Sequence, residues 1–255
     1  MTGSPLVVML LVVTGCTVPD KAAVPDPRLT ERHATRHDTV GEQAPPRLEH
    51  PAMVRFHMER YFDDLRTIER LLVAGKLDEA TTLAHLLTRS ASDPGLAVWK
   101  EEAERVAAAA SLVEHASTLD QALRREPTIA AACAACHERT HAHPTFTTNP
   151  PPPDRPTLEA WMARHQWAVD RLWEGVIGAD DLRWKAGLEI LATTPLPEML
   201  PKEAAHLQLL ARAALTKPSP TSGDRAAVYG DMLATCVACH ATRHAPRGEV
   251  AVEHR

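Results

Sequence analysis

Residues 54–72, VRFHMERYFDDLRTIERLL, carry apolar side chains at alternating intervals of four and three residues. This spacing puts one apolar stripe along a single helix face, as in a helix packed into a left-handed bundle. The same spacing returns in residues 158–176, LEAWMARHQWAVDRLWEGV, at an offset of 104. A glycine follows each stretch, Gly75 or Gly178, where a helix C-cap is expected. The sequence therefore predicts an internal repeat whose two halves each begin with such a helix.

The composition favours an all-α protein. Hydrophobic residues make up 44% of the 255 residues, aromatic residues only 4%, and no stretch alternates apolar and polar residues as a strand does. The net charge is -5 and no large basic block is present, so no nucleic-acid partner is expected.

Three further helices are predicted in each half. Asp93-Pro94 is expected to open one, Ser117 with Asp120 to form an N-cap pair for another, and Pro127 to kink that second helix. Gly230 occupies the position in the second half that matches Pro127. The predicted helices that follow the first of each half are 76–90, 95–115 and 118–142, then 179–193, 198–216 and 223–243.

The motif C-x-x-C-H occurs twice, as Cys133-Ala134-Ala135-Cys136-His137 and as Cys236-Val237-Ala238-Cys239-His240. It is the attachment signature of a c-type haem. On a helix, positions i, i+3 and i+4 share one face, so both thiols reach the vinyl groups of one porphyrin. The histidine then points at the iron as its proximal ligand. Two covalently bound haem c groups are therefore predicted, held by Cys133, Cys136, Cys236 and Cys239, with His137 and His240 as proximal iron ligands.

Other chemistries explain the cysteines alone. Two C-x-x-C pairs suit a zinc site, one pair suits a redox dithiol, and either suits a disulfide. None of these needs a histidine directly after the second cysteine, twice. A structural zinc site is also expected in a compact knuckle, rather than on helices about a hundred residues apart.

The N-terminus reads as a signal peptide. Residues 6–13, LVVMLLVV, form an apolar run too short to span a bilayer, and Thr14-Gly15-Cys16 follows it. This end resembles a bacterial lipobox, which implies cleavage before Cys16 and a lipid on its thiol, although no Lys or Arg precedes the run. An ordinary signal peptide with a coincidental cysteine is the alternative. Both predict export, in agreement with haem c attachment outside the cytoplasmic membrane, and Thr17 favours the outer membrane.

With C-x-x-C-H near the end of a fourth helix and a basic residue shortly after it (Arg139, Arg243), each half resembles the cytochrome c′ family. The resemblance covers most of the predicted mature chain and implies two tandem left-handed antiparallel four-helix bundles. The predicted segments are then a signal peptide (1–15), a lipid-anchored flexible tether (16–51) that contains His33, His37 and His50, a first bundle (52–146), a Pro-rich spacer (147–156), a second bundle (157–246) and a tail (247–255).

The residue on the other face of each iron decides the function. The family places its distal residue on the first helix, about where Met58 and Met162 lie, and a Met there would raise the potential for electron transfer. Plain core packing is the alternative for both Met residues. His165 competes as a ligand in the second half, and the candidates for contacts with haem propionates are Arg55, Arg139 and Arg243.

The sequence thus predicts an exported dihaem cytochrome that transfers single electrons between periplasmic redox proteins. The alternative, also implied by the resemblance, is a protein that binds NO or CO on five-coordinate haem. A third alternative is a structural module in which the haem groups only stabilise the bundles. No nucleophile–base pair, carboxylate dyad or second metal site stands out, so no enzymatic activity is predicted. The oligomeric state is left open.

Overall fold

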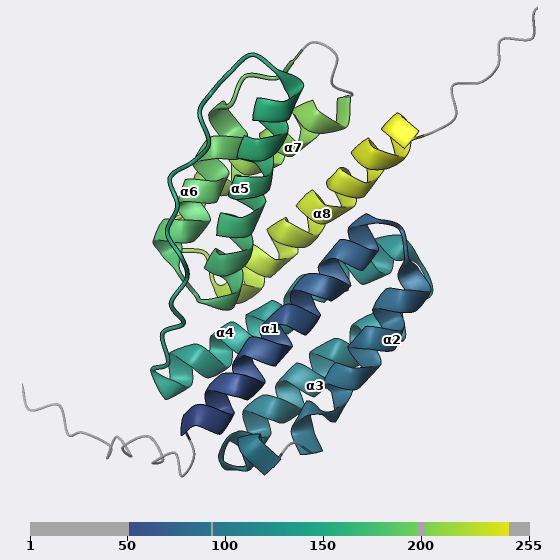
Figure 1. Cartoon of the computed structure of the whole chain (residues 1–255), viewed down its shortest axis with the longest axis vertical. Helices are drawn as coiled ribbons and strands as arrows, with labels where there is room; N and C mark the ends of the chain where they lie inside the picture. The colour runs from purple at the N-terminus through teal and green to yellow at the C-terminus, as the bar shows by residue number, and fades with distance from the viewer. Residues whose placement is uncertain (1–50, 93, 198–201, 245–255) are drawn as a thin grey trace, which may run out of the picture. The chain divides into compact units, whose positions relative to one another are not determined.

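The computed structural model describes residues 51–92, 94–197 and 202–244. Within these ranges every regular element is a helix, which confirms the all-α prediction (Figure 1). Cys16, the signal peptide, nearly all of the tether and the tail lie outside the described residues, as does the side chain of Arg243. The elements are α1 (Pro51–Val73), α2 (Leu77–Thr88), η2 (Arg89–Ser92), η3 (Pro94–Trp99), α3 (Lys100–Glu114), α4 (Leu119–Thr140), α5 (Leu158–Ile177), α6 (Asp181–Thr193), α7 (Lys202–Leu215) and α8 (Ser222–His244).

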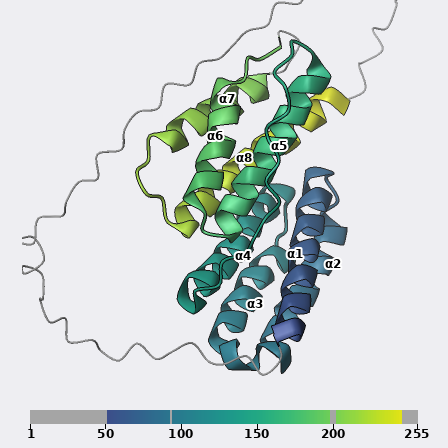
Figure 2. The same ribbon diagram turned by 60° about the vertical axis from the view of Figure 1, so that its left-hand side comes forward.

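The helices pack in two sets that meet at the helices carrying the two motifs. In the first set α1 contacts α2 and α4, and α3 contacts α2 and α4. In the second set α5 contacts α6 and α8, and α7 contacts α6 and α8. α4 and α8 lie side by side and join the sets (Figures 1 and 2). The described helices belong to one compact unit.

The first helix of each half forms where the apolar stripe predicts it. Leu65, Ile68 and Leu72 on α1, and Leu172 and Val176 on α5, are buried at 0 or 1% exposure. Burial of such aliphatic side chains contributes roughly 1.5–3 kcal/mol each. These side chains, rather than helix propensity, hold α1 and α5 in place.

The two glycines after these helices have different roles. Gly75 has φ +77°, and the N–H of Lys76 donates to the carbonyl of Leu71, so Gly75 is a left-handed C-cap as predicted. Gly178, with φ −93°, is the C-cap residue of α5. The predicted C-cap at Gly178 is therefore confirmed, but the left-handed residue is the next one, Ala179, with φ 50°. Gly178 is small for another reason, because a Cβ there would lie 2.9 Å from the ring of Phe146.

Two details at helix starts also differ from prediction. α4 is capped by Thr118, whose side chain accepts from the N–H of Gln121, while the Gln121 side chain accepts from the N–H of Ser117. The N-cap is thus one residue later than in the predicted Ser117–Asp120 pair, and Gln121 binds the residue before the N-cap rather than the N-cap itself, as it would in a capping box. A 3-10 helix begins at Pro94, and the α-helix starts only at Lys100. α4 continues without a break through Pro127.

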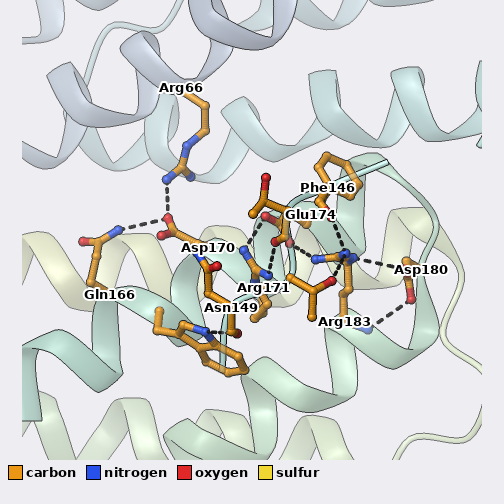
Figure 3. A network of polar contacts seen from close by, with 12 residues as sticks. Arg66, Phe146, Asn149, Gln166, Asp170, Arg171, Glu174, Asp180 and Arg183 are labelled. Atoms are coloured by element: carbon orange, nitrogen blue, oxygen red, sulfur yellow. Dashed lines mark hydrogen bonds and ion pairs between the residues drawn. The ribbon is translucent and has the colours of Figure 1, made fainter. Parts of the chain in front are cut away.

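The chain between α4 and α5 runs without regular structure and is fixed to α5 and α6 by side-chain donors (Figure 3). Arg164, Trp167 and Arg171 of α5 donate to backbone carbonyls of this segment. Arg183 of α6 donates to the carbonyl of Phe146 and also pairs with Glu174. The Pro-rich spacer is thus held along the second set of helices.

In the described part of the chain, no helix is both apolar enough and long enough to cross a bilayer.

Candidate functional site

The first C-x-x-C-H motif opens into a cavity. Cys133, Cys136 and His137, near the end of α4, all line one cavity of about 580 Å³. This volume lies within the range of cofactor pockets, roughly 300–1,000 Å³. Most of the other lining is apolar and includes Leu65 of α1, Val106 of α3 and Ile177 at the end of α5. The motif therefore presents two sulfurs and an imidazole to one largely apolar space.

His137 is held in a defined tautomer. Its Nδ1 lies 2.9 Å from the backbone carbonyl oxygen of Ile177. A carbonyl can only accept, so Nδ1 carries the proton and donates it. Nε2 then keeps its lone pair, the arrangement that metal-binding histidines adopt. Burial lowers the pKa of His137, which also favours the neutral ring.

The first two cysteines are free thiols. Cys133 and Cys136 form no disulfide, and burial raises the pKa of Cys133 to about 12 and that of Cys136 above its ordinary value. Redox dithiols instead need a lowered pKa, because the thiolate is the nucleophile. No cluster of three or more His, Cys, Asp or Glu side chains suited to a metal ion occurs within residues 51–92, 94–197 and 202–244. A haem iron takes at most two ligands from the protein, so this finding does not bear on haem.

The structure brings some predicted neighbours to this cavity. Met58 and Arg55 of α1 both line it. Arg139 instead pairs with Glu102 at 3.1 Å, and Glu102 lines the cavity. Trp99 was not predicted from the sequence, and its indole Nε1 is buried without a hydrogen-bond partner beside the cavity. An unpaired buried donor at a cavity wall suits an acceptor on a bound ligand.

The second motif, on α8, lies against His165. Cys236 is buried, and its sulfur lies 4.0 Å from Nε2 of His165. The ring of His165 stacks on Trp161, with ring centroids 5.0 Å apart, and its Nδ1 is buried without a partner. Burial, with a smaller effect of His240, lowers the pKa of His165 to about 4, so the ring is neutral. His165 therefore approaches the second motif from α5. Met162, also on α5, is half-buried.

The helices that carry the motifs pass very close to each other. A Cβ added at Gly230 of α8 would lie 3.0 Å from the Cα of Arg124 of α4. The absent side chain lets the two backbones meet, which explains the glycine that matches Pro127. Cys236 lies less than two turns beyond Gly230, ~9 Å, and Cys133 about two and a half turns beyond Arg124, ~14 Å. The backbones at the two motifs are therefore at most about 27 Å apart.

No protein-family model, curated protein or solved structure matches the chain.

Proposed function

We propose that this protein is a dihaem c-type cytochrome that passes single electrons between redox proteins on the periplasmic side of the membrane. The observation that carries the proposal is the first motif. Two thiols and the Nε2 lone pair of His137 share one cavity of about 580 Å³, and Ile177 holds the imidazole in the metal-binding tautomer. Repetition of the motif on α8 extends the proposal to a second haem.

The residues of the cavity fit a haem c. Cys133 and Cys136 would hold it through thioethers formed when each S–H adds across a vinyl group. His137 would bind the iron, Trp99 Nε1 and Arg55 would donate to a propionate, and the apolar wall would exclude water. When bound, the haem supplies one-electron chemistry by cycling its iron between the ferric and ferrous states. The protein's part is to fix the ligand set and to keep the site dry.

Two tandem four-helix bundles of the cytochrome c′ type are part of this proposal. The contacts support it, because in each set of helices the first contacts the second and the fourth, and the third contacts the same two. Each motif then lies on the fourth helix, α4 or α8. Export, lipid attachment at Cys16 and contact with periplasmic redox proteins belong to the proposal on the sequence alone.

The two sites are proposed to differ in their distal ligand. Met58 lines the first cavity, whereas His165 lies beside the second motif. A Met ligand stabilises ferrous iron and raises the potential relative to a His ligand. The first site would therefore hold its electron more tightly, so that electrons pass from the second site to the first.

Gas binding is the second candidate, and one observation favours it. Tyr61, Phe62 and Leu65 of α1 also line the first cavity. If these side chains, rather than Met58, covered the distal face, the iron would keep an open position for NO or CO.

An optical spectrum of the purified chain, reduced and oxidised, with and without CO, separates these functions. Electron transfer predicts low-spin six-coordinate haem at both sites, a sulfur–iron band in the near infrared, and no change with CO. A high-spin spectrum that shifts with CO would replace this proposal with the second. A purified chain without haem would refute both.

A further inference from the structure

Two carboxyl groups are buried in the core, one on α1 and one on the motif-bearing helix α4. Glu69 of α1 is 4% exposed and Glu126 of α4 is 0% exposed. Both oxygens of Glu126 are buried without a hydrogen-bond partner. A buried carboxylate without a partner costs several kcal/mol, whereas the neutral acid avoids most of this cost. The geometry therefore favours a bound proton on this pair.

The charges around the pair are few. Arg66 of α1 pairs with Glu69 at 3.0 Å and also with Asp170 of α5 (Figure 3). From α8, the buried phenol of Tyr229 faces Glu69. One guanidinium thus faces three acids, and it cannot neutralise them all. Burial, opposed by Arg66, raises the pKa of Glu69 to about 6, and burial together with the charge of Glu69 raises that of Glu126 well above its ordinary value.

The pair of carboxyl groups also lies near both motifs. Glu126 lies seven residues before Cys133 on α4, so the two share one helix face about two turns apart, ~10 Å. Tyr229, whose phenol faces Glu69, lies seven residues before Cys236 on α8 in the same way. Electrostatic coupling between sites is reciprocal, so a negative charge that arrives at either motif makes the pair hold a proton more tightly. Asp170, whose side chain is 37% exposed, and Arg66 connect Glu69 to the surface.

We propose that the Glu69–Glu126 pair takes up a proton when the protein accepts an electron, so that the chain carries electrons and protons together. The inference rests on the proposed dihaem function. One electron from a donor redox protein enters a site, and one proton from solvent bonds to a carboxylate oxygen of the pair. The buried region gains no net charge, and oxidation by the acceptor protein releases the proton again.

The test is a potentiometric titration of the purified haem-bearing chain between pH 5 and pH 9. We expect the midpoint potentials to fall as the pH rises, by up to about 59 mV for each tenfold change in proton activity. In the E69Q/E126Q double variant both side chains stay neutral, so the potentials should not change over the same range. Removal of one exposed carboxylate in the control Glu189→Gln should leave the slope of the wild type.

A second measurement examines the pair without relying on the potential. Infrared spectra of the wild-type chain at pH 7 should show the carbonyl band of a protonated carboxylic acid, and Glu126→Gln should remove it. Gln has the shape of the neutral acid, so this variant is expected to fold. Haem-bearing protein with pH-independent potentials, or without the band, would overturn this inference and leave the proposed function standing. A chain without covalent haem would overturn both.

Discussion

The carbonyl oxygen of Ile177 accepts a hydrogen bond of 2.9 Å from Nδ1 of His137. Ile177 is the last residue of α5, whereas His137 belongs to the motif on α4. The second set of helices therefore completes the site of the first. The imidazole is oriented by the backbone of the folded chain, and a ligand that binds to Nε2 finds it in place.

Exchange of Met58 for Leu tests the assignment of distal ligands. Met58 lines the first cavity, so Met58→Leu should convert that site to five-coordinate iron that binds CO, in about half of the total haem. Met162→Leu is the matched control, and it should leave the spectrum unchanged because His165 lies beside the second motif. CO titrations followed in the visible spectrum measure both variants. Equal responses from the two would contradict the assignment.

The buried carboxyl pair makes stability depend on pH. The pKa of Glu69 is about 6 in the folded protein, against an ordinary 4.5, so between these values the folded chain holds more protons than the unfolded chain. The free energy of unfolding should therefore fall as the pH rises through this window, on the order of 2 kcal/mol for Glu69. Glu126 extends the loss to higher pH.

Urea unfolding at several pH values, followed by circular dichroism, measures this effect. The difference between the wild type and E69Q/E126Q isolates the pair, because the other titrating groups cancel. A constant difference from pH 4 to pH 8 would show that the pair does not titrate in the folded state.

The close contact of α4 with α8 predicts a cost at Gly230. A methyl group there would lie 3.0 Å from Cα and 3.2 Å from the carbonyl oxygen of Arg124, so the backbones must separate. Gly230→Ala should destabilise the protein by about 1–3 kcal/mol, as overpacked sites do. In Gly223→Ala, also on α8, the new methyl has only one neighbour within 4 Å, at 3.8 Å, so stability should be unchanged or slightly raised. Thermal unfolding measures the stability of both variants. Equal losses of stability would refute the close contact between α4 and α8.

Exchanges between alanine and glycine at positions 179 and 75 should have opposite effects on stability. Ala179 holds φ 50° at the end of α5, a conformation that glycine adopts without strain. Ala179→Gly should therefore stabilise the protein by up to about 1 kcal/mol. Gly75 has φ +77°, and Gly75→Ala should cost about 1–2 kcal/mol although it has open space. Melting temperatures measure both changes. A loss of stability in Ala179→Gly would show that the backbone of Ala179 is not strained.

The stripe on the first helices predicted α1 and α5 well, because it records which side chains are buried. The caps were predicted only in part. Gly178 is the C-cap residue, as expected, but the left-handed counterpart of Gly75 is Ala179, at the offset of 104 with which the stripe repeats. A Cβ at Gly178 would lie 2.9 Å from the carbonyl oxygen of Glu174 and also 2.9 Å from the ring of Phe146, and no local pattern reveals the contact with Phe146, a residue of another segment.

The part of the site that lies on a single helix was predictable from the sequence. The spacing of Cys133, Cys136 and His137 indicated one shared face, and they line one cavity. Trp99 and Ile177 were missed because they reach the cavity from other helices. Glu126 was missed because a charged residue in a helical pattern is ordinarily exposed, and only the packing of α4 against other helices buries it.

Covalent haem is the central claim, and the intact mass of the denatured, purified full chain tests it most directly, together with a pyridine haem count. The account predicts a mass increased by two haems, a red band on a denaturing gel, and one haem in each of the paired variants C133A/C136A and C236A/C239A. A chain whose mass matches the polypeptide without haem, or which keeps both haems when either pair is removed, would contradict it.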